Sequence, residues 1–453
     1  MESIQVLADE ISGFLWGWPM MILLLGTHLY LTIRLHFPQK HIFKAIKISV
    51  QRDPDSKGDV SQFAALATSL AATIGTGNIV GVATAVTLGG PGAIFWCWLT
   101  GVFGISTKYA EGLVAVKYRQ VTSNGKMLGG PMYALEKGLH MKWLAVLFCI
   151  FTVFASLGIG STVQSNSIST ILNDTYSIPL WLTGSVISFV FLLVVLFGVK
   201  GISRVCSAVV PFMALFYILG CIYILILNSA YVWPAVKLIV ESAFNPAAAG
   251  GGFVGGTVIM AARYGMARGL FSNESGLGSA PIVAAAAKTR NSVRQALVSS
   301  TGTFWDTVVI CALTGIVLIS CLLAGEIEYT DGASLTKEAF AMIPYVGTPI
   351  LVVGMVFFAF TTILGWCYYS ERAFEYLCGK KYIVGFRLFY CLTCFAGAVM
   401  NLGLVWSLAD SMNALMAIPN LVSLLLLSRV IVLETKKYLW YDRLDEYDET
   451  LVR

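Results

Sequence analysis

The residues from Gly75 to Asn78 could bind a small ion or zwitterion through their backbone. They read Gly-Thr-Gly-Asn and lie inside an apolar run long enough to cross a bilayer. Glycine destabilises a helix by about 1 kcal/mol relative to alanine, so we expect the helix to break here. A break exposes amides that can hold a carboxylate and carbonyls that can hold a cation. The alternative is close packing of an unbroken helix through Gly77 and Gly81.

A second interruption lies in the apolar run between residues 253 and 287. Gly265 and Gly269 precede the sequence FSNESGLGSAP, whose composition does not suit an uninterrupted helix. We therefore expect this run to break within 263–278. Backbone groups in hydrocarbon must be paired within their own segment, buried in protein or turned toward a cavity. Two breaks thus predict a cavity in the middle of the bundle.

The composition indicates a membrane protein. Of the 453 residues, 57% are hydrophobic and 12% are charged, against about 25% charged in soluble proteins. There is no basic patch with interleaved aromatic residues to suggest nucleic acid, and no obligate protein partner is evident. The ten cysteines are scattered, without the spacing of a zinc site. We expect an all-α, multi-pass protein of the cell membrane, whose main partner is the lipid bilayer.

A crossing requires about 20 apolar residues, and the sequence offers eleven such segments. If the N-terminus lies outside, the inner loops and the tail carry 24 of the 30 Lys and Arg residues, the outer loops carry two, and four fall within spans. Positive residues concentrate on the cytoplasmic side, so the C-terminus is predicted to be cytoplasmic. The predicted spans lie near residues 14–35, 62–87, 91–116, 143–172, 178–199, 205–229, 253–287, 295–323, 347–374, 383–402 and 405–432.

The ten spans after the first divide into two groups of five, at 59–232 and 233–435. Each group opens with an interrupted run, and an odd number of spans makes the groups enter the membrane from opposite sides. Such inverted halves are typical of secondary transporters that bind their substrate between the two breaks. Residues 1–58 would supply the first span and an amphipathic helix on the inner surface, although 38–50 could equally be an ordinary connection. Residues 436–453 would form a cytoplasmic tail.

Five motifs resemble those of the alanine or glycine:cation symporter family. The resemblance covers the chain from about Asp59 to Thr435. It implies uptake of alanine and glycine driven by a sodium gradient, with no organic cofactor. It also implies the inverted five-helix repeat of the bacterial leucine transporter, with one extra helix before it. The motifs are ATIGTGNIVGVATAVTLGGPGAIFW (72–96), TKYAEG (107–112), GGPMYALEKGL (129–139), ARGLFSNESGLGSAPI (267–282) and ILGWCYYSERAFEYL (363–377).

A zwitterion needs donors for its carboxylate, acceptors for its ammonium and a wall sized to its side chain. We expect the amides of the first break to bind the carboxylate, and carbonyls near Thr73 and along the second break to bind the ammonium. Gln164 is a further polar candidate, or else makes an interhelical hydrogen bond. Trp366 and Met260 could form the wall, or simply pack. The predicted substrate-binding residues are Thr73, Gly75, Thr76, Gly77, Asn78, Gln164, Met260, Asn273 and Trp366.

The resemblance also implies a sodium site. In the related fold, two carbonyls of the first broken helix and two adjacent hydroxyls of a later helix bind the ion. Aligned on the GxGN pattern, the carbonyls fall at Ala71 and Ile74. The later helix, in the sequence FFAFTTILGW, supplies the adjacent hydroxyls of Thr361 and Thr362. The alternative for the threonines is a hydrogen bond back to their own helix.

Charged residues inside spans are costly and often functional. Lys108 and Glu111 lie three residues apart and could pair near the inner end of their span. Arg263, Arg268 and Glu274 flank the second break and could form an inner gate.

Two more charges have open roles. Asp306, expected near the inside, and Asp410, expected near the outside, could each act as a gate or as a packing charge. The histidines lie away from the predicted breaks, at His28, His36, His41 and His140. No pattern of an intramembrane enzyme or a channel pore is present. A proton-coupled amino-acid transporter of the same fold remains the main alternative, with Glu274 as its titratable group.

Overall fold

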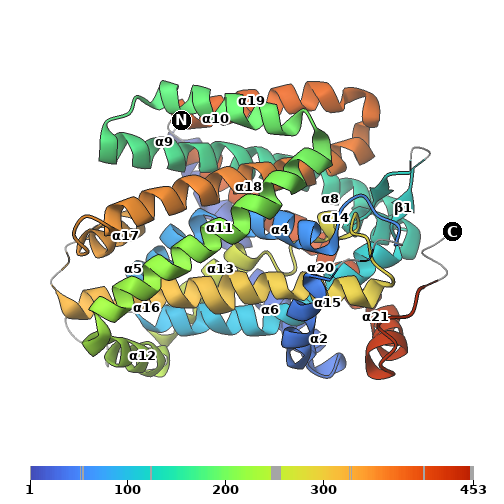
Figure 1. Ribbon diagram of the computed structural model, residues 1–453, viewed down its shortest axis with the longest axis horizontal. Helices are drawn as coiled ribbons and strands as arrows, with labels where there is room; N and C mark the ends of the chain where they lie inside the picture. The colour runs from blue at the N-terminus through green and yellow to red at the C-terminus, as the bar shows by residue number, and fades with distance from the viewer. Residues whose placement is uncertain are drawn as a thin grey trace.

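The computed structural model describes residues 2–51, 53, 56–122, 125–245, 257–325, 327, 329–400 and 403–448. It is a helical bundle in which several long helices cross at a range of angles (Figure 1). The sheet in the described part of the chain has two short strands, β1 (Gln120–Val121) and β2 (Met127–Leu128), paired antiparallel.

The first half of the bundle opens with a bent helix and continues through four more long elements. A short helix lies between its second and third long elements. In order they are α4 (Gln62–Thr73), η2 (Gly77–Gly81) with α5 (Val82–Gly89), α6 (Gly92–Lys117), the short α7 (Pro131–Tyr133) with η3 (Ala134–Gly138), α8 (Lys142–Ala155) with η4 (Ser156–Thr162) and α9 (Val163–Tyr176), α10 (Leu180–Val195) and α11 (Gly198–Leu227).

The second half repeats this order of elements. It too opens with an interrupted helix and places a short helix between its second and third long elements. Its members are α13 (Val258–Asn273) with α14 (Pro281–Ala284), α15 (Ser292–Thr303) with η6 (Phe304–Cys311) and α16 (Ala312–Ala324), the short α17 (Gly332–Ala341), α18 (Gly347–Cys378), α19 (Ile383–Val399) and α20 (Gly403–Leu426).

Each short helix packs on the broken helix of the other half. α17 places Gly332 against Thr84 of α5, and α7 places Pro131 beside Gly278, next to α14. The remaining elements lie outside the repeat or connect its members. They are α1 (Glu2–Leu15), α2 (Trp18–Arg34), η1 (Pro38–His41), α3 (Ile42–Ser49), α12 (Ser229–Phe244), η7 (Lys380–Tyr382), α21 (Ser428–Thr435) and η8 (Lys436–Trp440).

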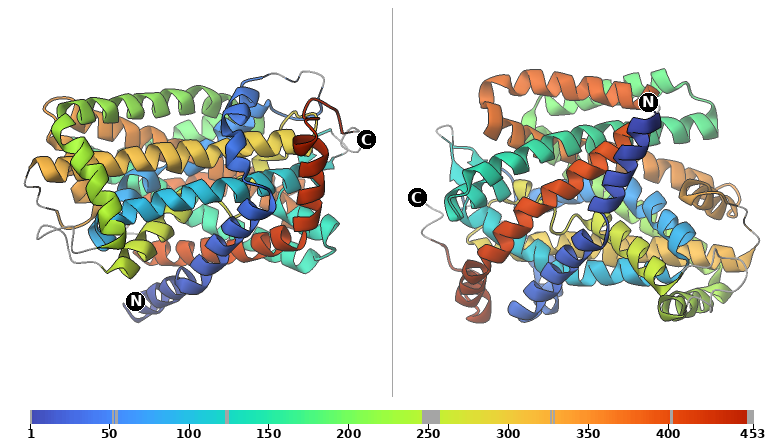
Figure 2. Two further views of the ribbon diagram at one scale, coloured as in Figure 1. Left: turned by 90° about the horizontal axis from the view of Figure 1, so that it is seen from below. Right: turned by 180° about the vertical axis from the view of Figure 1, so that it is seen from behind.

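The N-terminal helices lie against the outside of the repeat. α1 runs beside α20, and α2 packs on α6 (Figure 2). The indole Nε1 of Trp16 donates to the carbonyl of Asp410 at 3.0 Å. The predicted amphipathic segment is helical, and it buries Ile42, Ala45 and Ile48 while Phe43 stays 78% exposed. α3 packs on α15, and its position on the inner membrane surface stays a prediction.

Seven helices in the described part of the chain are long and apolar enough to cross a membrane, or eight if α4 and α5 form one span. They include the predicted first span, which extends over Gln5–Arg34. α10 is apolar but has 16 residues. α13 also has 16 residues, and α6, although 26 residues long, is not apolar enough to be counted. The count of eleven spans therefore stays a prediction.

The loops predicted to face inward meet at one end of the molecule, which we call the tail end. Lys44 contacts Asp442 in the tail. Arg119 donates to the carbonyls of Lys57 and Ala287. The opposite end carries α17 and α12 (Figure 1). The loops thus gather as the charge pattern predicts, although the side of the membrane that each end faces stays a prediction.

Candidate functional site

The first apolar run is broken where the sequence predicts. After α4 the chain is extended at Ile74 and bends by 55° before the helix resumes. Asn78 closes the break, because its Oδ1 accepts from the amide of Gly75 at 2.9 Å. The amides of Thr76 and Gly77 have no acceptor in the described part of the chain. These two donors are therefore available to an anion.

The second break begins within the predicted interval. α13 ends at Asn273, and Glu274, Gly276 and Gly278 then take positive φ values of 52°, 94° and 86°. The amide of Ser275 donates to Oδ1 of Asn273 at 2.9 Å instead of continuing the helix. The last carbonyls of α13 consequently lack backbone donors among the described residues and can accept from a ligand.

Glu111 on α6 holds the second break in place. Its Oε1 accepts from the amides of Gly276 and Gly278, each at 3.0 Å, and from Nδ2 of Asn420 at 2.7 Å. The predicted pairing with Lys108 is wrong, since neither residue forms an ion pair within the described chain. The carboxylate binds backbone amides freed by the break instead of an ammonium group.

The predicted sodium ligands of the first break meet one hydroxyl of α18. Oγ1 of Thr362 lies 3.1 Å from the carbonyl oxygen of Ala71 and 3.4 Å from that of Ile74. A Cβ added at Gly75 would lie 2.7 Å from the same hydroxyl oxygen. A glycine is thus required for α18 to approach the break this closely.

Thr361 has different neighbours. Its hydroxyl donates to the carbonyls of Phe357 and Phe358 on its own helix, at 2.9 and 3.1 Å, which is the alternative use of such a threonine. Thr362 also donates to the Phe358 carbonyl, at 2.9 Å. The two hydroxyls therefore share the carbonyl oxygen of Phe358 as an acceptor. The sequence did not indicate that this carbonyl lies beside the predicted sodium ligands.

A small cavity of about 20 Å³ lies between the two breaks, and we call it the inner cavity. It has room for about one water molecule. It contains predicted residues from both breaks and from α9 and α18, together with residues that the sequence did not single out. Its lining consists of Ala72, Thr73, Gly75, Thr76, Gly77, Ile159, Gln164, Phe271, Ser272, Glu274, Thr362, Trp366 and Asn413.

Two amide oxygens in this lining lack hydrogen-bond partners. Oε1 of Gln164 and Oδ1 of Asn413 are buried and accept from no described residue. Nε2 of Gln164 is held by the carbonyl of Ile159 at 3.1 Å, which fixes the side chain. Phe271 and Ser272 belong to the family motif at residues 267–282, whereas no sequence signal indicated Asn413.

Trp366 forms one wall of the inner cavity and is 1% exposed. A Cβ on Gly160 would collide with its side chain, so this glycine permits the close approach of η4. Of the other predicted residues, Asn78 and Asn273 shape the breaks and do not line the cavity. Met260 lies in the first turn of α13, where its carbonyl is near Gly89, and it contributes nothing to the wall.

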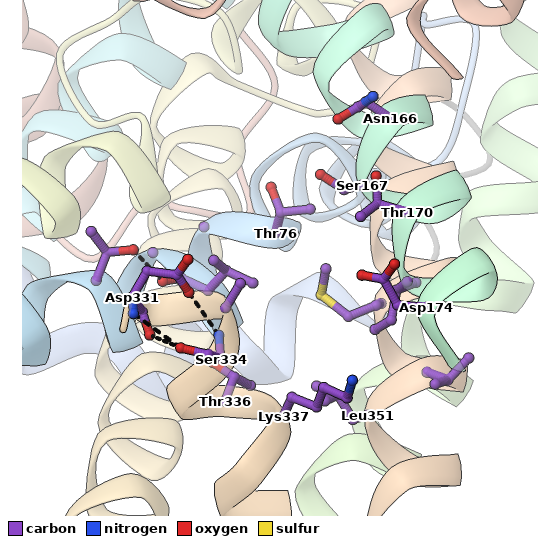
Figure 3. A pocket seen from close by; sticks show the side chains of 18 of the residues that line it. Thr76, Asn166, Ser167, Thr170, Asp174, Asp331, Ser334, Thr336, Lys337 and Leu351 are labelled. Atoms are coloured by element: carbon purple, nitrogen blue, oxygen red, sulfur yellow. Dashed lines mark hydrogen bonds between the residues drawn. The ribbon is translucent and has the colours of Figure 1, made fainter. Parts of the chain in front are cut away.

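A larger cavity of about 660 Å³, the vestibule, leads from the inner cavity toward the α17 end. The cavities share Thr76, Gly77 and Phe271. Figure 3 shows its two polar sides. Asn166, Ser167, Thr170 and Asp174 lie along α9, and opposite them lie Asp331, the N-cap of α17, and Ser334, Thr336 and Lys337 within α17. Small polar molecules could reach the inner cavity by this route.

Three expectations about charged residues need correction. Arg268 lines the vestibule, as Asp410 does, so it lies on the side away from the predicted inner loops and is no inner gate. Asp306 lies between the breaks, where it contacts both Asn78 and Ser272. His28 is fully buried beside the second break, 3.8 Å from where a Cβ on Gly276 would lie.

The model of the sodium:alanine symporter family matches residues 1–450. The chain is 51% identical to the sodium/alanine symporter AgcS of Methanococcus maripaludis over 441 residues, covering 95% of this chain and 96% of AgcS. It is 34% identical to the probable sodium/glutamine symporter GlnT of Bacillus subtilis, covering 97% and 91%.

Among solved structures, the fold resembles that of MhsT in complex with L-phenylalanine. The TM-score is 0.54 at 14% identity, and the match covers 83% of this chain and 98% of MhsT. This likeness confirms the predicted leucine-transporter-type repeat with two broken helices. The family resemblance read from the five motifs is confirmed as well. The chain belongs to the sodium:alanine symporter family, and it is therefore a membrane transporter.

Proposed function

We propose that the protein imports small neutral amino acids, alanine and glycine, together with sodium by alternating access. One observation carries the proposal: free amides of the first break and free acceptors of the second break line the same small cavity. A zwitterion requires this combination. Neither set would remain unpaired in a bundle that served only to pack helices, because buried polar groups are normally hydrogen-bonded.

The substrate carboxylate is assigned to the amides of Thr76 and Gly77. They begin the helix formed by η2 and α5, whose dipole also favours an anion. The ammonium group is assigned to the acceptors on the other side of the cavity. These are the unpaired oxygens of Gln164 and Asn413 and the last carbonyls of α13, at Phe271 and Ser272.

Sodium is a hard cation and prefers oxygen ligands. The carbonyls of Ala71, Ile74 and Phe358 and the hydroxyl of Thr362 form the oxygen cluster that supports this assignment. Thr361 would join after a rotation of its hydroxyl away from its own helix. The ion would bind beside Gly75, so it would hold the first break in the shape that the carboxylate needs. Binding of the two would then be mutually favourable.

The wall formed by Trp366 limits the substrate's side chain. The inner cavity holds about 20 Å³, which is room for about one water molecule, so its walls must move to admit even alanine and must move further for a longer side chain. AgcS is named for alanine and GlnT for glutamine. The tight wall favours alanine or glycine over a longer side chain in this chain.

The distribution of Lys and Arg supports an orientation in the membrane. The vestibule opens at the α17 end, and the Lys- and Arg-rich loops meet at the tail end. We assign the tail end to the cytoplasm, with the N-terminus outside, because positive loops remain inside. The conformation would then be open toward the outside and closed toward the cytoplasm.

Uptake into proteoliposomes tests the proposal. Radiolabelled alanine should accumulate when sodium is high outside, and removing the sodium gradient should abolish accumulation. Unlabelled glycine, L-alanine and D-alanine should be tried as competitors, with glutamine as the larger comparison. Accumulation that ignores the sodium gradient, or stronger competition by glutamine than by alanine, would contradict the proposal.

Coupling to protons is the second candidate. Glu274 supports it, because this residue lines the inner cavity and its carboxyl group accepts from Oγ of Ser279 at 2.5 Å. The same vesicles decide between the two. A proton gradient imposed without sodium should drive no uptake if sodium is the coupling ion, and should drive full uptake if Glu274 carries the coupling proton.

A further inference from the structure

We propose that the carboxylate of Asp306 positions the two helix breaks relative to each other, and thereby sets the affinity for the amino acid. This inference rests on the proposed function. Asp306 lies in η6, in the middle of a long helical element, and is fully buried. It does not line the inner cavity, so its role would be positional and not a direct contact with substrate.

The first contact reaches the first break. Nδ2 of Asn78 donates to Oδ1 of Asp306 at 2.6 Å. The other end of the same amide, Oδ1, accepts from the amide of Gly75. One side chain therefore connects the carboxylate to the turn whose free amides are assigned to the substrate carboxylate.

The second contact reaches the second break. Oγ of Ser272 donates to Oδ2 of Asp306 at 3.0 Å. Ser272 lies in the last turn of α13, where the free carbonyls are assigned to the ammonium group. Asp306 thus connects the donor side of the site to the acceptor side through two hydrogen bonds.

A third donor completes the carboxylate. Oγ1 of Thr307 donates to Oδ2 at 2.6 Å from the same helix. Three donors on two oxygens suit an ionised carboxylate, which only accepts, and hydrogen bonds to a charged group are roughly twice as strong as neutral ones. Asp306 forms no ion pair with a described residue, and these bonds help to stabilise a charge in the protein interior.

The distance between the two breaks must match the separation of a carboxylate and an ammonium group in an α-amino acid. A rigid link between them would lower the cost of binding, because the relative position of the two breaks is already fixed. Loss of the link would leave the separate groups intact but would require the substrate to organise them. The free energy of amino-acid binding would therefore weaken by more than the free energy of unfolding of the substrate-free protein falls.

Two variants and a matched control test this. Asp306→Asn is isosteric but presents a donor where Ser272 and Thr307 now donate. Ser272→Ala removes the second link. Thr307→Val is the control, since it removes one buried hydrogen bond to the same carboxylate without touching either break. Each purified protein is assayed for alanine binding in sodium, for alanine uptake, and for melting temperature without substrate.

The first two variants should weaken alanine binding at least about tenfold, as expected for lost charge-assisted hydrogen bonds. Thr307→Val should keep its affinity for alanine within about twofold of that of the parent protein. Its melting temperature should fall by about as much as those of the first two variants. In the Asp306→Asn background, Ser272→Ala should cause little further loss of affinity, because both substitutions break the same hydrogen bond. Unchanged affinity in Asp306→Asn, or equal losses in Thr307→Val, would overturn the inference.

Ser272→Thr keeps the hydroxyl and provides a second comparison if Asp306→Asn does not fold. Affinity retained in Ser272→Thr and lost in Ser272→Ala supports the link, and equal affinity in both overturns it. If the parent protein takes up alanine in a sodium-dependent way, the proposed function stands whatever the variants do. If it takes up none, the proposed function fails separately.

Discussion

At the scale of residues, the site depends on backbone groups that single side chains hold in place. Asn78 pairs with Gly75, Asn273 pairs with Ser275, and Glu111 pairs with two amides of the second break. Each of these side chains makes a hydrogen bond that a regular helix would have made through its own backbone. Most of the residues that carry the remaining amides and carbonyls line the inner cavity: Thr76, Gly77, Phe271 and Ser272.

Gly75→Ala should abolish sodium-driven uptake. The added Cβ would lie 2.7 Å from Oγ1 of Thr362 and 3.7 Å from Oε1 of Gln164, so either α18 or the break must move. Uptake in proteoliposomes is the measurement. The control is Gly26→Ala on α2, where a Cβ meets nothing within 4 Å. Uptake by Gly75→Ala equal to that of the control would show that the close approach of α18 is dispensable.

Thr362→Val and Thr361→Val should differ. Thr362 contacts two carbonyls of the first break, whereas Thr361 bonds within its own helix. Thr362→Val should raise the sodium concentration for half-maximal uptake at least about tenfold, the effect of roughly 1.4 kcal/mol. Thr361→Val should raise it less. The reverse order in a sodium titration of alanine uptake would assign the ion to Thr361.

At the scale of elements, the positions at which helices break could be predicted from the sequence. Which residues of each helix line the cavity could not. Glycine-rich sequence in an apolar run indicated both breaks, because glycine destabilises a helix and the two runs lie at corresponding positions of the two halves. Met260 was a poor candidate once α13 was seen to begin at Val258. It precedes the end of that helix by 13 residues, or about 20 Å at 1.5 Å per residue.

Other residues depended on contacts between helices that no local pattern encodes. Asn413 enters the inner cavity from α20, and Asp306 reaches both breaks from η6. His28 belongs to the extra helix α2, which packs on α6, so its distance in sequence from the breaks was misleading. The pair Ala71 and Thr362, by contrast, came from the family resemblance and not from spacing.

Glu111 should be needed to keep the second break folded. Glu111→Ala would leave the amides of Gly276 and Gly278 and the side chain of Asn420 without their common acceptor. Each unpaired buried group costs about 1–3 kcal/mol. The purified variant should melt at a clearly lower temperature and take up little alanine. Glu111→Gln keeps an acceptor oxygen and should be intermediate; a melting temperature for Glu111→Ala equal to that of the parent would contradict this role.

At the scale of the whole molecule, the vestibule opens at the α17 end, and hydrogen bonds and ion pairs close the tail end. The segment before α4 and the segment after α14 are joined by backbone hydrogen bonds, from Asp59 to Ala286 and from Lys288 to Val60, each at 2.8 Å. The C-terminal tail lies over this junction, since Nδ2 of Asn291 donates to the carbonyls of Leu444 and Glu446. Opening toward the tail end must separate these contacts.

Asp53 connects the two arginines of this closed end. Its carboxylate pairs with Nε of Arg290 at 2.9 Å and with Nε of Arg294 at 3.0 Å, and Arg294 also pairs with Asp445 of the tail at 2.7 Å. The Asp53 and Arg294 side chains are almost fully buried. Removing one partner of a buried pair costs far more than removing an exposed one. Asp53→Asn should therefore favour opening of the tail end.

A cysteine at Ser69, buried in α4 on the tail side of the first break, would report that opening. In a Cys378→Ser background, which removes an exposed thiol, Asp53→Asn should increase the rate of maleimide labelling about tenfold, the effect of a shift of about 1.4 kcal/mol between the two conformations. Lys44→Ala is the matched control, because its ion pair with Asp442 lies at the same end but is exposed. Labelling that rises equally in both variants would mean that loss of any charge at this end loosens the bundle. An increase confined to Asp53→Asn would place the free energy that holds this end closed in the buried pairs of Asp53.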